Sequence, residues 1–148
     1  MLAAPAGFFL PVIAVTSLAP FGMKATVDAG AATASASYYI SPSGSDSNSG
    51  LSPSSPWKTI SRANSQQLLP GATISFQGGN TYSGMLYLPP SDEGTAQSPI
   101  TITSYGTGNA TINGGTGNAI DAYDTSGITI ENLSLTGSGA ATNTGDGM

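Results

Sequence analysis

Short runs of β-branched residues alternate between apolar and hydroxyl side chains along most of the chain after residue 37. Residues two apart in a strand point to the same face, so each run has one apolar and one hydroxyl-bearing face. Turn residues such as Gly, Asn, Ser and Pro separate the runs. The pattern predicts six strands, at Ala72–Phe76, Met85–Leu88, Ile100–Ser104, Ala110–Asn113, Asn118–Ala122 and Ile128–Thr136.

One tripeptide recurs at a constant interval within these strands. Thr73-Ile74-Ser75, Thr101-Ile102-Thr103 and Thr129-Ile130-Glu131 follow one another at steps of 28 residues. A period of this size indicates a solenoid, in which each repeat stacks on the preceding one. We therefore expect an all-β solenoid of about two to three coils with parallel strands, isoleucines stacked inward and threonines facing out.

Glycine-rich corners and one asparagine are expected to turn the chain between the faces of the solenoid. Gly78-Gly79 and Gly114-Gly115 are examples, because glycine adopts positive φ angles readily. Asn132 divides the last predicted run and can take the same left-handed conformation.

A helix-like stretch runs from Ser55 to Gly71, before the first coil. Ser55 can serve as N-cap and Pro56 as the first helical residue, and Pro70-Gly71 would end the helix. The open end of a solenoid exposes apolar core and unpaired backbone groups, so we expect this helix to cap it, with Trp57 as the anchor. Residues 38–71 would hold an N-terminal strand and the cap helix, and residues 72–148 the first coils.

The first 37 residues have the character of a leader. The apolar run Phe8–Val15 is far shorter than the roughly 20 residues of a membrane span, and Ala34-Ser35-Ala36 has the form that signal peptidase accepts. We expect residues 1–37 to be a signal peptide, and the protein to be secreted or periplasmic. The alternative is a disordered Ala/Ser-rich N-terminus, since no Lys or Arg precedes the apolar run.

Charge and composition exclude several classes of function. Three Lys+Arg stand against eight Asp+Glu, which makes nucleic-acid binding a poor interpretation because few phosphates could be neutralised. The chain has no Cys and no His, which rules out thiol chemistry, a soft metal site and a His-based triad within it.

Four segments resemble a known family: Tyr38–Ala63, Pro70–Gly84, Gly94–Gly115 and Gly127–Gly137. They are similar to the N-terminal part of secreted right-handed parallel β-helix proteins of the pectate-lyase-like superfamily. The resemblance implies a right-handed parallel β-helix with many more coils, so we expect this chain to be a fragment whose catalytic coils lie beyond residue 148. Members include polysaccharide lyases and glycoside hydrolases, and fold alone does not choose between them.

No catalytic residue is assigned within the chain. The resemblance implies that a lyase would use Arg or Lys as base, but Lys58 and Arg62 are the only cations after the leader and both fall on the expected helix. A hydrolase needs paired carboxylates. Asp121, Asp124 and Glu131 are the candidates, and solvated surface carboxylates are the preferred interpretation.

No metal site is assigned either. Asp46-Ser47-Asn48-Ser49-Gly50 has the D-x-N-x-G spacing that begins a calcium loop, but the twelfth position is Trp57 where such a loop has Glu. Asx-turns formed by Asp46 and Asn48 are the preferred interpretation. Asp92-Glu93 is expected to serve solubility only. A requirement for Ca²⁺ in the full-length protein stays open.

Four tyrosines could stack on sugar rings if they face outward: Tyr82, Tyr87, Tyr105 and Tyr123. We expect a monomer whose partner is a polysaccharide, without a membrane span. The first hypothesis is an extracellular polysaccharide lyase or glycoside hydrolase acting on acidic plant or algal polysaccharide, with this fragment itself inactive. The alternative is a non-catalytic β-helix module for glycan binding or adhesion.

Overall fold

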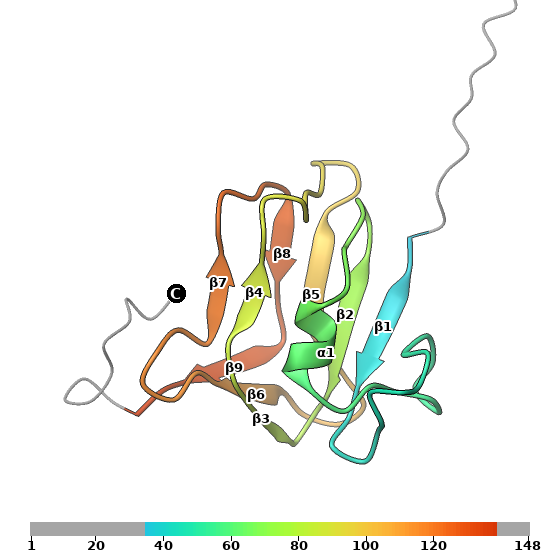
Figure 1. Ribbon diagram of the computed structural model, residues 1–148, viewed down its shortest axis with the longest axis vertical. Coiled ribbons are helices and arrows are strands. Elements are labelled where there is room, and N and C mark those ends of the chain that lie inside the picture. Colours follow the sequence, from blue (N-terminus) through green and yellow to red (C-terminus); the bar gives the residue numbers. More distant parts are fainter. Residues whose placement is uncertain (1–34, 139–148) are drawn as a thin grey trace, which may run out of the picture. The chain divides into compact units, whose positions relative to one another are not determined.

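The computed structural model describes residues 35–138 of the 148-residue chain. Within this range nine strands and one short helix follow one another (Figure 1). The elements are β1 (Ser37–Ile40), α1 (Ile60–Asn64), β2 (Thr73–Gln77), β3 (Thr81–Ser83), β4 (Leu86–Leu88), β5 (Ile100–Tyr105), β6 (Ala110–Asn113), β7 (Ile120–Ala122), β8 (Ile128–Ile130) and β9 (Leu133–Thr136).

The expected leader falls almost wholly on residues that the structure does not describe, and its last residue, Ser37, begins β1. In the described range, no helix has the length and apolar character needed to cross a membrane.

The strands form three sheets in which every pairing is parallel. Their orders are β1-β2-β5-β8, β3-β6-β9 and β4-β7, so strands adjacent in a sheet come from successive turns of the chain (Figure 1). β2, β3 and β4 make one coil, β5, β6 and β7 the next, and β8 and β9 the start of a third. The predicted parallel β-helix is confirmed.

The isoleucine column predicted from the 28-residue step is present. Ile74 lies opposite Ile102, and Ile102 opposite Ile130, in adjacent parallel strands. Ile74 is 1% exposed and Ile102 0%, whereas Ile130 is 40% exposed. Burial falls at Ile130 because the described residues place no further coil over β8.

The corner at Asn132 divides the predicted strand 128–136 into β8 and β9. Its φ angle of 54° is left-handed, as expected for an asparagine at this turn. The side-chain amide donates to the Thr103 hydroxyl at 3.2 Å, and the Ser104 hydroxyl donates to the Asn132 carbonyl at 2.7 Å. The corner is therefore tied to the coil before it.

Strand β3 was not predicted. It has only three residues, fewer than the four to eight over which alternation is normally legible, and long-range pairing with β6 stabilises it. Its central residue, Tyr82, is buried and its hydroxyl donates to the carbonyls of Ile40 (3.1 Å) and Gln77 (3.2 Å). Tyr82 is therefore not an outward sugar-stacking ring, and burial raises its pKa to about 12.

The predicted helix boundaries were wrong. α1 spans only Ile60–Asn64, and Thr59 is its N-cap in place of Ser55, with its hydroxyl accepting from the Arg62 N–H at 3.1 Å. Trp57 is not helical because it pairs with β1: its N–H donates to the Tyr39 carbonyl at 2.8 Å. This pairing is long-range, and local helix signals cannot reveal it.

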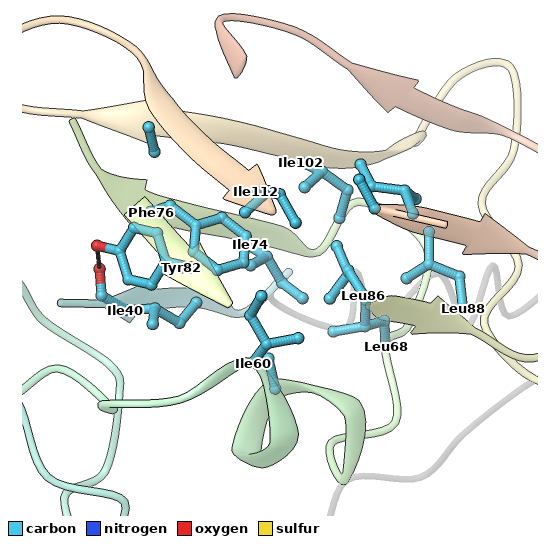
Figure 2. Packing of buried hydrophobic residues seen from close by; sticks show 14 of the residues in the cluster. Ile40, Ile60, Leu68, Ile74, Phe76, Tyr82, Leu86, Leu88, Ile102 and Ile112 are labelled. Carbon is cyan, nitrogen blue, oxygen red and sulfur yellow. Dashed lines mark hydrogen bonds between the residues drawn. The ribbon is translucent and has the colours of Figure 1, made fainter. Parts of the chain in front are cut away.

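The core fills the space between the three sheets and the segment around α1. Trp57 is fully buried, and Ile60, Ala63 and Leu68 from this segment join the inward residues of the coils. Figure 2 shows Ile60 near Ile74 and Leu68 beside Leu86. The α1 segment therefore contributes apolar cover to the first coil, as expected of a cap.

Candidate functional site

The outer face of the sheet β4-β7 carries an aromatic ring beside a carboxylate. Tyr87 of β4 lies opposite Asp121 of β7. Leu86, Leu88 and Ile120 are buried, so strand alternation turns Tyr87 and Asp121 outward. Adjacent strands are about 4.8 Å apart, which places both side chains on one small surface.

A second ring extends this surface. The Tyr123 N–H donates to the Leu88 carbonyl at 3.1 Å, which continues the β4–β7 pairing one residue past β7. Tyr123 is two residues after Asp121, and its side chain is 62% exposed. We call Tyr87, Asp121 and Tyr123 the tyrosine face.

The three candidate carboxylates do not form one cluster. Asp121 lies on β7 and Asp124 in the corner after it, with a φ angle of 49°. Glu131 follows β8 in a different sheet, where its N–H donates to the Ile102 carbonyl at 3.0 Å. Within residues 35–138, no three His, Cys, Asp or Glu side chains are close enough to hold a metal ion.

The tyrosine face has the chemistry of a sugar-binding surface. Tyrosine rings pack against the apolar faces of sugars, and a carboxylate accepts hydrogen bonds from sugar hydroxyls. Cleavage of a glycosidic bond needs a second carboxyl group roughly 5 to 10 Å from the first. Asp124 is the nearest carboxylate in sequence, but it lies in an exposed corner after β7 and not on a strand of this face.

The Tyr105 side chain points outward, but its ring is already in contact with another ring of the protein. It lies on the outer face of the four-stranded sheet, where its ring meets that of Tyr39 edge-on at 5.2 Å. Tyr39 of β1 lies opposite Ser75 of β2, and Tyr105 of β5 lies opposite Gln77 of β2. Ser75 is buried although it points outward. Burial raises the pKa of Tyr105. Sequence reasoning missed Tyr39, although its alternation with buried Ile40 could have placed it outside.

Asp46 organises the loop before α1 and forms no local Asx-turn. One carboxylate oxygen accepts from the N–H groups of Lys58 and Thr59, both at 2.9 Å, and the other accepts from the Thr59 hydroxyl at 2.9 Å. Desolvation acts to raise the pKa of Asp46, but these hydrogen bonds and the Arg62 charge bring it below its ordinary value. Both oxygens of the Asp46 carboxylate therefore serve to hold the loop in place.

Asn48 also bonds across the loop. Its side-chain amide donates to the Pro56 carbonyl at 2.9 Å, and its own carbonyl accepts from the Trp57 indole N–H at 2.9 Å. The expectation of local Asx-turns at Asp46 and Asn48 was therefore wrong, because both residues bond to a segment eight to thirteen positions away.

The expectation that Asp92 serves only solubility was wrong. Asp92 is 2% exposed and accepts a hydrogen bond from the Leu68 N–H at 3.0 Å. Burial raises its pKa, which the hydrogen bond partly opposes. Glu93 beside it is exposed.

The two described cations do not lie on the coils. Arg62 of α1 has its guanidinium 4.2 Å from the centre of the Trp57 ring and donates to the Ser65 hydroxyl at 2.9 Å. Lys58 precedes α1 and is exposed. Neither residue is placed as a lyase base on the outer face of a coil.

These observations define a parallel β-helix whose outer face has sugar-compatible chemistry. No protein-family model matches the chain. A curated lacto-N-biosidase from Bifidobacterium longum subsp. longum is 32% identical over 111 residues, which cover 71% of this chain and 7% of that protein.

Two solved structures share the fold. The selenomethionine form of the GH136 lacto-N-biosidase from Eubacterium ramulus superimposes with a TM-score of 0.64 at 24% identity, covering 72% of this chain and 21% of that one. The native form gives a TM-score of 0.59 at 22% identity, covering 71% and 21%. The chain is thus similar to a small part of glycoside hydrolases with a β-helix, and none of these relatives is a pectate lyase.

Proposed function

We propose that this chain forms the capped first coils of the β-helix of a glycoside hydrolase that acts on glycans outside the cytoplasm. The similarity to the lacto-N-biosidase from Bifidobacterium longum, 32% identity over 111 residues, carries the proposal. The β-helix fold, the tyrosine face and the leader-like residues 1–37 support it.

The relatives also favour a different glycan from the one that the sequence led us to expect. They are named for lacto-N-biose, a neutral disaccharide, and not for an acidic plant or algal polysaccharide. We therefore propose a lacto-N-biosyl glycan as the substrate of the complete protein.

Catalysis is expected to need residues other than those described. Asp121 is the carboxylate of the tyrosine face, and residues 35–138 bring no second carboxylate onto this face from a neighbouring strand. In the proposed enzyme the tyrosine face would hold glycan, and the acid and base would come from other coils.

The test compares two proteins on one chromogenic substrate. The product of the complete reading frame that contains this sequence should release p-nitrophenol from p-nitrophenyl lacto-N-bioside, whereas the 148-residue chain should release none. Polygalacturonate serves as the acidic comparison substrate. Cleavage of polygalacturonate alone would contradict the proposed substrate.

A non-catalytic glycan-binding module is the second candidate. The absence of an assembled carboxylate pair from the tyrosine face favours it. It would be the better assignment if the complete protein bound lacto-N-biose in calorimetry yet hydrolysed no glycoside.

A further inference from the structure

A groove of about 400 Å³ lies between the start of α1, with the segment before it, and strand β3, and it shares no lining residue with the tyrosine face. Its apolar lining comes from Pro42, Ile60 and Tyr82. Ile60 and Tyr82 are 4% and 5% exposed, so they form the floor. Figure 2 shows the Tyr82 hydroxyl bonded to Ile40, and the Tyr82 ring also packs against Phe76 at 5.0 Å, so only the small exposed part of this ring lines the groove.

Polar groups surround this floor. Lys58, Ser61, Thr81 and Ser83 line the groove and are exposed. Thr81 and Ser83 flank the buried Tyr82 on β3, so their side chains share the outer face of the strand and line the rim of the groove, with the residues about 6.6 Å apart. An apolar floor with a few polar groups at its rim is a usual composition of a small-molecule site.

These four polar side chains have no hydrogen-bond or ion-pair partner within the part of the chain that the structure describes. The other polar lining residue, Thr59, is different, because its hydroxyl donates to Asp46 and accepts from the Arg62 N–H. Three hydroxyls and one ammonium group are therefore available to a ligand.

The charge of the groove indicates which ligand would fit. No lining residue is acidic, and the nearby Asp46 carboxylate is already held by three hydrogen bonds. Arg62 is committed to Trp57 and Ser65, so Lys58 is the cation left for an incoming anion within the described residues. An ammonium group without an acidic partner favours a ligand with a negative charge.

We propose that this groove binds a sugar unit that carries a carboxylate or a sulfate. The apolar floor packs against one face of the pyranose ring, the hydroxyls of Ser61, Thr81 and Ser83 bond its hydroxyl groups, and Lys58 pairs with its anionic substituent. The inference rests on the proposed function for the ligand being a glycan. It adds a site for an acidic branch or neighbour of the unit that is cleaved.

The experiment titrates the isotope-labelled 148-residue chain with three sugars and follows its backbone amides by NMR. Methyl galactoside is the neutral probe, galacturonic acid the carboxylate probe and galactose 6-sulfate the sulfate probe. At least one acidic sugar should shift the amides of Lys58, Ser61, Thr81 and Ser83, with about fivefold tighter binding than the neutral sugar. The two acidic probes show which anion is recognised.

Variants separate charge from shape. Lys58→Gln should remove the preference for the acidic sugar while leaving the neutral affinity unchanged, and Thr81→Val with Ser83→Ala should weaken all three sugars. Ser91→Ala, which removes an exposed hydroxyl outside the groove, is the matched control. About 0.5 M salt should weaken only the acidic sugars, because it screens an exposed charge pair.

Several outcomes would overturn the inference: equal affinity for neutral and acidic sugars, a preference that survives Lys58→Gln, or no shift up to roughly 50 mM of any probe, where millimolar binding would be visible. Hydrolysis of lacto-N-biosides is measured separately. Its failure would not change the amide shifts, so the two proposals can fail independently.

Discussion

The side chain of Asn64 takes the place of a strand beside Tyr87. Its amide oxygen accepts from the Tyr87 N–H at 3.1 Å, and its amide nitrogen donates to the Met85 carbonyl at 2.9 Å. Tyr87 belongs to β4 and Met85 immediately precedes it, and both backbone groups lie on the side of the strand that does not pair with β7. Because an unpaired strand edge can recruit other chains, one asparagine of α1 both fixes the helix and protects the first coil.

Replacing Asn64 tests this relationship. Asn64→Ala should lower the free energy of unfolding by about 1–2 kcal/mol, since two hydrogen bonds to β4 are lost but the backbone groups can meet water. Asn64→Asp should also destabilise, because a carboxylate cannot donate to the Met85 carbonyl. Urea unfolding followed by the fluorescence of Trp57, the single tryptophan, measures both.

The matched control is Asn109→Ala, at an exposed asparagine before β6 with no side-chain hydrogen bond in the described structure. It should change stability by less than about 0.5 kcal/mol. Equal effects of Asn64→Ala and Asn109→Ala would show that the contact with β4 contributes nothing.

Asp92 should make the folded state less stable as pH rises. Its pKa is raised by burial in the folded state, so the folded chain binds more protons than the unfolded chain between the ordinary value of 3.8 and the raised one. Stability from this group is present below the ordinary pKa and is lost as pH rises through the folded pKa. Unfolding curves across this range should show Asp92→Asn to be free of this loss.

Asp92→Ala gives the complementary result. It removes the acceptor for the Leu68 N–H and should cost about 1–3 kcal/mol, because a buried donor is left unpaired. Glu93→Gln, at the exposed neighbour, is the control. If Asp92→Asn kept the full pH dependence of the wild type, the burial of the Asp92 carboxyl would not be its source.

Sequence reasoning succeeded where a local pattern repeats and failed where a residue is placed by distant parts of the chain. The alternation around Ile74, Ile102 and Ile130 was sufficient to predict the solenoid, because the 28-residue step between them places successive coils in register. The predicted start of the helix was wrong because Trp57 pairs with β1. The burial of Asp92 was missed because its hydrogen-bond donor, the Leu68 N–H, is distant in sequence.

The candidate surface was predictable only in part. Tyr87 and Tyr123 were among the tyrosines named from sequence, and strand register brings Asp121 to the same face. Tyr82 could not be placed, because β3 is too short to show which of its faces is apolar. The groove lined by Lys58 and β3 joins segments far apart in the chain, which spacing alone cannot bring together.

Gly78 is required for space and not for backbone conformation. A Cβ atom at this position would overlap the Gly108 carbonyl oxygen and lie 2.6 Å from that of Thr107. Both are backbone atoms of the next coil and cannot move without breaking the 2.8 Å hydrogen bond from the Gly78 N–H to the Tyr105 carbonyl. Gly78→Ala should therefore destabilise by about 3 kcal/mol, at the upper end of the range for overpacking.

Gly117→Ala is the matched control for this change. The nearest atom to a Cβ at Gly117 is the Gly114 carbonyl oxygen at 3.8 Å, which is an ordinary contact. It should be neutral or slightly stabilising, because alanine restricts the unfolded chain. Thermal unfolding of the two variants would contradict the close-approach argument if their midpoints were equal.

The contribution of the column isoleucines to the free energy of unfolding should decrease toward β8. Ile102 is fully buried between Ile74 and Ile130, so Ile102→Ala should cost about 2–5 kcal/mol through lost burial and a cavity. Ile130 is 40% exposed, so Ile130→Ala in the 148-residue chain should cost less than about 1 kcal/mol. Urea unfolding measures both variants. Equal costs would mean that another part of the protein, or a second copy of it, covers Ile130 in solution.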